Sequence, residues 1–109
     1  MPWLLREDQV LAALEVAESR RDRMRGLLGR DGIDGALLLQ PGKSVHSFGM
    51  RFPLDVAFCD KSMVVVRIVS LPPNRVTRPT LRGHCVIEAE QGAFERWKLC
   101  PGDQLDIRD

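Results

Sequence analysis

The sequence lacks any surplus of charge, and this argues against one large class of partner. Lys plus Arg total 16 and Asp plus Glu total 15, so the net charge is +1. Basic residues concentrate only at Arg20, Arg21, Arg23, Arg25 and Arg30, where no aromatic residue is interleaved and Glu18 and Asp22 lie nearby. Nucleic-acid binding usually needs a basic field and exposed aromatics. We therefore interpret this cluster as a solvated helix face and expect no nucleic-acid partner.

Cysteines are few and are not arranged in pairs. The chain has 3, at Cys59, Cys85 and Cys100, with no Cys-x-x-Cys motif. An odd, widely spaced set argues against a disulfide framework and against a four-cysteine zinc site. We expect buried, reduced thiols that pack as small apolar groups. His84 and Cys85 would point to opposite faces of a strand, and one histidine with scattered acids is a weak ligand set, so we expect no metal and no cofactor.

Long hydrophobic runs are also missing. No segment approaches the roughly 20 apolar residues that cross a membrane, and the first residues show no basic segment followed by a long apolar one. We expect a cytoplasmic protein with no membrane partner. With 44% hydrophobic residues in 109, the chain can bury a core as one domain spanning residues 1–109, and we expect a monomer or a weak oligomer.

What the sequence does contain is a series of short apolar runs separated by turns. Asp60-Lys61-Ser62 is short enough to join two of them as a hairpin. This pattern of short apolar runs and turns predicts a mainly β fold, a compact antiparallel β-sandwich or barrel-like domain with one or two short helices. The expected strands are 36–39, 45–52, 54–59, 63–71, 84–90 and 104–107.

Two segments favour helix. Ser19 can cap a helix whose first turn contains Asp22, whose apolar face is Met24, Leu27 and Leu28, and which ends at Gly29. The second expected helix is 92–99, with Phe94 and Trp97 facing inward. Residues 10–17 are ambiguous: their alanine and leucine content leans towards helix, whereas their alternation suits a strand.

The stretch 44–60 is the most promising place for a site. In a strand over 45–52, alternation puts His46, Phe48, Met50 and Phe52 on one face. A histidine on an apolar face needs a hydrogen-bond partner or a pocket opening. His46 can therefore be a satisfied, half-buried residue that orders the sheet, or a group that contacts a ligand in an apolar cleft.

Three charged residues could border this cleft: Arg51, Asp55 and Glu88. Asp55 lies opposite in parity to Leu54 and Val56, so it can bond backbone amides near the turn after Pro53, or it can orient His46. Glu88 can pair with an arginine such as Arg25 or Arg51, or it can join His46 in acid–base work.

Four segments resemble the DUF192 family, small proteins with no established function. They are RGLLGR (25–30), VHSFGMRFPLDV (45–56), VIEA (86–89) with Gly92, and PGD (101–103), and the resemblance covers about residues 10–107. It implies a compact, mostly antiparallel β fold, with the Arg-Gly-Leu segment on a short helix and with residues 10–17 as a strand. It implies no catalytic or ligand assignment.

Two functional hypotheses follow. The first is a non-enzymatic β domain that binds a small ligand or a protein partner in a cleft lined by His46, Phe48, Met50 and Phe52. The alternative is a small hydrolase- or isomerase-like enzyme that uses His46 with Asp55 or Glu88. An enzyme would need His46 within about 3 Å of a carboxylate, directly or through one water, whereas a binding module needs only the cleft.

Overall fold

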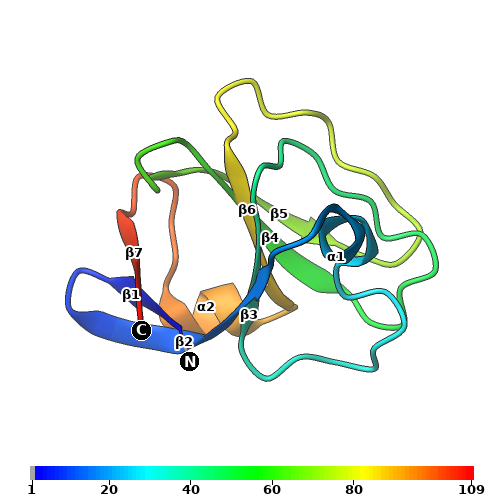
Figure 1. The fold of residues 1–109 in the computed structure, drawn as a ribbon, viewed down its shortest axis with the longest axis horizontal. Helices are drawn as coiled ribbons and strands as arrows, with labels where there is room; N and C mark the ends of the chain where they lie inside the picture. Colours follow the sequence, from blue (N-terminus) through cyan, green and yellow to red (C-terminus); the bar gives the residue numbers. More distant parts are fainter. Residues whose placement is uncertain (1) are drawn as a thin grey trace.

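The computed structural model describes residues 2–109 and shows strands through most of the chain, with two short helices (Figure 1). The elements in chain order are β1 (Trp3–Arg6), β2 (Gln9–Ala17), α1 (Arg20–Arg25), β3 (Ala36–Leu39), β4 (Leu54–Cys59), β5 (Val65–Leu71), β6 (Cys85–Glu90), α2 (Ala93–Trp97) and β7 (Leu105–Arg108). The predicted mainly β class is confirmed.

All strands join one seven-stranded sheet in the order β5-β4-β6-β3-β2-β1-β7. Its pairs are antiparallel except for β2 and β3, which run parallel, so the sheet is mixed. An isolated bridge between Val64 and Gln104 links the regions beside its two edge strands, but the sheet is not closed into a barrel. Trp3 pairs with Arg108, which brings the two ends of the chain together (Figure 1).

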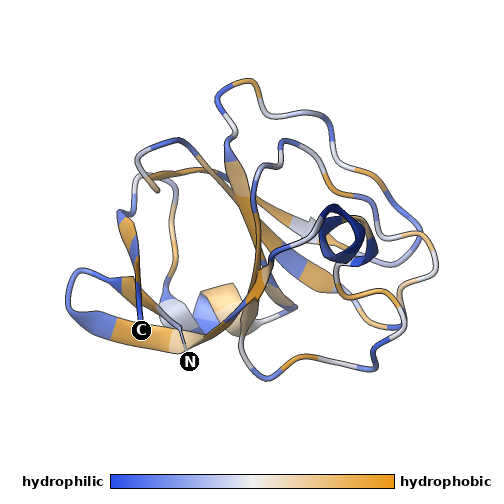
Figure 2. Ribbon diagram, viewed as in Figure 1, coloured by the Kyte–Doolittle hydropathy of each residue, from blue (hydrophilic) through white to orange (hydrophobic). Residues whose placement is uncertain are grey.

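Most predicted elements form, but residues 10–17 and the end of the first helix differ from the prediction. Residues 10–17 belong to β2, as the family resemblance implied, so the leaning of local propensity towards helix was wrong. Ser19 caps α1 as predicted, since its Oγ accepts a hydrogen bond from the Asp22 amide at 3.0 Å. The helix, however, ends at Gly26, not Gly29, and Met24 on it is exposed. Figure 2 accordingly shows α1 as a hydrophilic helix beside hydrophobic strands.

The central strands bury both of their faces. On β4, Leu54, Val56 and Phe58 belong to one apolar core, and Ala57 and Cys59 belong to a second core on the other face. The second core is covered by α2, whose Phe94 is buried and whose Trp97 packs at its edge, as predicted. The first core is covered by Leu27 and by the long loops beside α1. Residues at even positions of β4 and β6 therefore face α1.

Two further findings concern the thiols and the membrane. Cys59 and Cys85 are buried and unpaired as expected, but Cys100 is exposed, so the prediction of buried thiols was wrong there. Within residues 2–109, neither helix has the length and apolar character needed to cross a bilayer.

Candidate functional site

Residues 45–52 form a loop and not the predicted strand. Their only ladder contact in the described chain is a single bridge between His46 and Val76. The loop is held instead by residues 72–77, largely through Ser47, which is fully buried. The Ser47 amide donates to the Arg75 carbonyl at 2.8 Å, and the Arg75 amide donates to Ser47 Oγ at 2.9 Å. The alternation that suggested a strand therefore does not describe which side chains are buried here.

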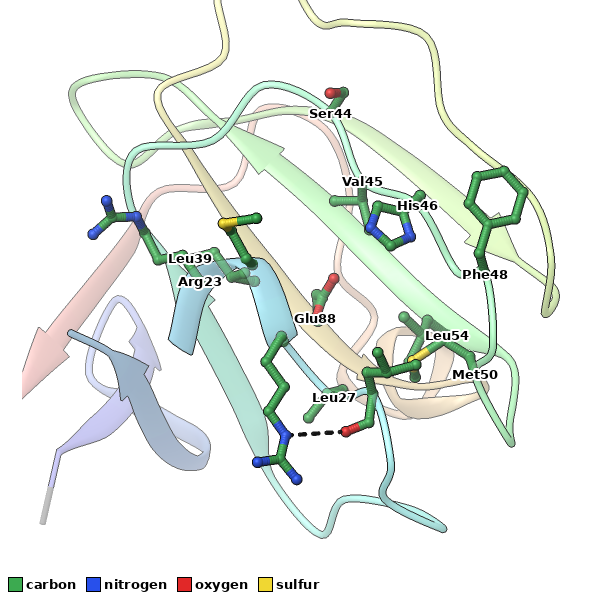
Figure 3. A pocket seen from close by; sticks show the side chains of 14 residues that line it. Arg23, Leu27, Leu39, Ser44, Val45, His46, Phe48, Met50, Leu54 and Glu88 are labelled. Atoms are coloured by element: carbon green, nitrogen blue, oxygen red, sulfur yellow. Dashed lines mark hydrogen bonds between the residues drawn. The ribbon is translucent and has the colours of Figure 1, made fainter. Parts of the chain in front are cut away.

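This loop, α1 and the sheet enclose a cavity of about 320 Å³, which we call the α1 pocket (Figure 3). Apolar side chains form most of its wall, and the carboxyl group of Glu88 reaches it from the sheet. The lining residues that matter below are Gly26, Leu28, His46, Phe48, Met50 and Glu88.

Three of the predicted site residues come together with Glu88 at this pocket. His46 and Phe48 are exposed and stack on each other, with ring centroids 5.4 Å apart and planes inclined by 23°. Met50 is buried and lies deeper. Because Met24 and Phe48 are 72% and 54% exposed, the pocket has an apolar rim open to solvent. The predicted half-buried position of His46 was wrong, since it stands at this rim.

Glu88 provides the unusual chemistry of the pocket. Its neighbours across the ladder are Leu37 on β3 and Val56 on β4, so apolar side chains flank the carboxyl group. Only 3% of Glu88 is exposed, and in residues 2–109 its Oε1 has no hydrogen-bond partner. Burial raises the pKa of Glu88 to about 7 from an ordinary 4.5. The expected ion pair with Arg25 or Arg51 is absent from the part of the chain described.

Asp55 faces away from the pocket, on the opposite side of the sheet. Its Oδ2 accepts hydrogen bonds from the amides of Gly92 at 2.9 Å and Phe94 at 3.1 Å, at the start of α2. The prediction that it bonds backbone amides is confirmed, although these amides belong to α2 and not to the turn after Pro53. The alternative, that Asp55 orients His46, is wrong, because Asp55 points to the α2 side of the sheet whereas His46 lies at the pocket on the other side.

Two other predicted residues lie outside the α1 pocket. Phe52 is buried in the core on the α1 side of the sheet and does not line the cavity. Arg51 is exposed and pairs with Asp31, its Nη1 lying 3.1 Å from Oδ1. An exposed pair of this kind contributes about 0–1 kcal/mol to stability. Neither residue is positioned to contact a molecule in the pocket.

The arrangement offers a hydrogen-bond acceptor at the base and apolar contacts above it. No hydrogen bond joins His46 to Glu88 among the described side chains, so they do not form a preassembled acid–base pair. Across residues 2–109, no three His, Cys, Asp or Glu side chains are grouped so that they could hold a metal ion. The chemistry of the pocket is therefore that of a polar anchor in an apolar wall.

The segments that line this pocket also match the sequence pattern of one protein family. The model of DUF192, described as "Uncharacterized ACR", matches residues 4–107. The chain belongs to the DUF192 family.

Relatives of this DUF192 domain agree with the fold. The UPF0127 protein PH1112 of Pyrococcus horikoshii is 29% identical over 97 residues, which cover 84% of each chain. A protein of unknown function from Novosphingobium aromaticivorans superposes with a TM-score of 0.81 at 17% identity, covering 96% of this chain and 82% of its own. A Sinorhizobium meliloti protein, whose name proposes a transcription regulator, gives a TM-score of 0.79 at 21% identity and coverage of 97% and 91%. At these identities the two structures show the fold alone.

One glycine of the DUF192 pattern, Gly26, lines the pocket, and a second, Gly49, lies against the lining residue Leu28; sequence patterns alone did not indicate either position. A Cβ added to Gly26 would lie 3.4 Å from Glu88 Oε1, and one added to Gly49 would lie 3.1 Å from Leu28 Cδ1. Both glycines have positive φ angles, of +52° and +78°. Positive φ and close approach each favour glycine, but a lone sequence does not show which glycines need them.

Replacing Gly26 with alanine tests this part of the wall. We expect G26A to lower the free energy of unfolding by about 2 kcal/mol, because the backbone is strained for any residue with a Cβ. The added methyl group should also perturb the nearby Glu88 carboxyl, whose titration can be followed by NMR. G102A is the matched control, since Gly102 has a φ of +97° and nothing within 4 Å of an added Cβ. A change in Glu88 titration that is equal in both variants would contradict the assignment.

Proposed function

We propose that this DUF192 domain is a binding module that holds a small ligand in the α1 pocket. The observation that carries the proposal is the carboxyl oxygen of Glu88, which is buried beside the pocket without a hydrogen-bond partner among residues 2–109. A buried polar group without a partner costs roughly 1–3 kcal/mol, so such groups are rare in folded proteins. A ligand that donates a hydrogen bond to Glu88 would supply the missing partner.

The shape of the pocket supports a small ligand. A cavity of about 320 Å³ is at the lower end of the range for small-molecule sites. The rim side chains Met24, Leu28 and Phe48 expose apolar surface that a bound molecule would cover. An apolar wall with one placed polar group is the usual composition of such sites.

Binding is favoured over catalysis. A carboxyl group with a pKa near 7 suits a general base, and this is the observation in favour of an enzyme. However, Asp55 caps α2, and His46 stacks on Phe48 without a carboxylate partner in the described chain. A binding module requires only Glu88 and the wall, whereas an enzyme requires further groups that would have to move into place.

A cytoplasmic location belongs to the same proposal. Cys59 and Cys85 lie directly opposite each other on β4 and β6 and are unpaired. Two neighbouring thiols without a disulfide between them suit a reducing compartment.

The proposal is tested by screening small aromatic and aliphatic compounds of different charge against the methyl-labelled protein by NMR. Compounds that bind should shift the methyl signals of Leu27, Val45, Met50 and Leu54, which line the pocket. We expect Phe48→Ala to weaken these compounds several-fold while changing stability by less than about 0.5 kcal/mol, because Phe48 is largely exposed.

Leu81→Ala is the control for this screen. Leu81 is also apolar and is 92% exposed, but it lies on a different loop, away from the α1 pocket. Its replacement should leave binding unchanged. If no compound shifts the pocket methyl signals at millimolar concentration, or if F48A and L81A weaken binding equally, the proposed function is wrong.

A further inference from the structure

The chemistry around Glu88 narrows the class of ligand. Its Oε1 is an acceptor that faces Gly26, where the absence of a side chain leaves the approach open. The residues opposite Glu88 on the two neighbouring strands, Leu37 and Val56, have no hydrogen-bond donor in their side chains. The missing partner must therefore come from the pocket side.

The charged and titratable side chains facing the pocket do not replace this partner. They are Arg23 and Arg25 from the α1 side and His46 from the loop. Arg25 donates its Nε–H to the Leu28 carbonyl at 3.4 Å, and Figure 3 shows the Arg23 side chain directed away from Glu88. Burial is the cause that raises the pKa of Glu88, and no arginine offsets it. When it is ionised, Glu88 is thus a buried anion without a cation partner among residues 2–109.

A buried anion is stabilised most by a cation that also donates hydrogen bonds. Hydrogen bonds between an ammonium group and a carboxylate are about twice as strong as those between neutral groups. A neutral donor would satisfy the oxygen but would leave the charge uncompensated. An anionic ligand would add repulsion to the existing cost of burial.

We infer that the ligand carries a primary ammonium group that pairs with Glu88, attached to an apolar body that contacts Met50, Leu54 and Phe48. The inference rests on the proposed function, because it assumes that the α1 pocket binds a small molecule. The cavity of about 320 Å³ limits this molecule to a short amine, either a free metabolite or the side chain of a lysine.

Three probes of similar shape and different charge test the inference at pH 7.5. They are 2-phenylethylamine, 2-phenylethanol and 3-phenylpropanoate, each titrated by methyl NMR against the wild type and Glu88→Gln. We expect the amine to bind at least about tenfold more tightly than the alcohol and the acid. This advantage should disappear in E88Q, which keeps the shape of the side chain but not its charge.

The outcomes separate this inference from the proposed function. Binding of the alcohol or the acid at the pocket methyl groups, equal to or tighter than that of the amine, would overturn the ammonium inference and leave the binding function standing. Absence of binding by every probe at the pocket would overturn both. A fourth probe, Nα-acetyl-lysine methylamide, distinguishes the source: tighter binding than 2-phenylethylamine indicates a lysine side chain, and weaker binding indicates a free amine.

Discussion

Replacing Glu88 with glutamine should remove a pH-dependent loss of stability worth up to about 3 kcal/mol. The pKa of Glu88 is about 7 in the folded protein and near its ordinary 4.5 when unfolded. Between pH 4.5 and pH 7, Glu88 is mostly protonated in the folded protein and mostly ionised in the unfolded chain. The free energy of unfolding therefore has its full contribution from Glu88 below pH 4.5, and this contribution is lost as the pH rises through 7.

The prediction is measured by urea unfolding of the wild type and E88Q between pH 4.5 and 8.5. We expect the stability of E88Q relative to the wild type to increase across this range and to level off above pH 7. All residues other than residue 88 are the same in both proteins, so their contributions cancel in the difference.

Glu90→Gln provides the control for this experiment. Glu90 is on the same strand but is exposed. E90Q should therefore follow the pH profile of the wild type. Parallel profiles for E88Q and the wild type would show that Glu88 is ionised in the folded protein as easily as in the unfolded chain, and the pocket would then lack its anchor.

The expected loss of stability at neutral pH makes the carboxyl group of Glu88 informative about function. A leucine or glutamine in the same place would avoid the cost of burying a charge between two apolar neighbours. Charged groups that reduce stability in this way tend to be found at functional sites, where binding or catalysis requires them. The stability that Glu88 removes at neutral pH would be regained when a cationic ligand binds.

Sequence patterns predicted the strands better than the site, for a physical reason. The runs at β4, β5 and β6 are apolar and end at turns, and burial of both faces of β4 and β6 requires that composition. The loop 45–52 shows the alternation that is typical of a strand, but Ser47 is fixed by hydrogen bonds to the distant residue Arg75. Such pairing between loops has no local signal.

Parity correctly put Asp55 on the face opposite Leu54 and Val56, but it did not reveal what covers that face. On a strand buried on both sides, a polar residue can face either core, and only the position of α2 shows that Asp55 meets its amides. For Glu88, Arg25 and Arg51 were the expected partners. In the structure Arg25 donates to the Leu28 carbonyl and Arg51 pairs with Asp31, and neither contact follows from the sequence pattern.

Replacing Asp55 with alanine should lower the free energy of unfolding by about 3 kcal/mol. The change removes the acceptor of the Gly92 and Phe94 amides, and Phe94 belongs to the buried core. Each buried donor left without a partner costs roughly 1–3 kcal/mol. In a domain of this size the loss corresponds to a decrease in Tm of about 13 °C, measurable by thermal unfolding.

Asp60→Ala is the matched control for Asp55→Ala. Oδ1 of Asp60 also accepts hydrogen bonds from two backbone amides, of Ser62 at 2.9 Å and Val64 at 3.1 Å. These lie in the turn between β4 and β5, where water can replace the carboxylate, so D60A should cost only about 1 kcal/mol. Equal losses in the two variants would show that burial does not determine the cost. D55N, which retains an acceptor, should remain folded and bind pocket compounds as the wild type does. If folded D55N instead lost binding in the α1 pocket, Asp55 would act with that pocket and not only as the cap of α2.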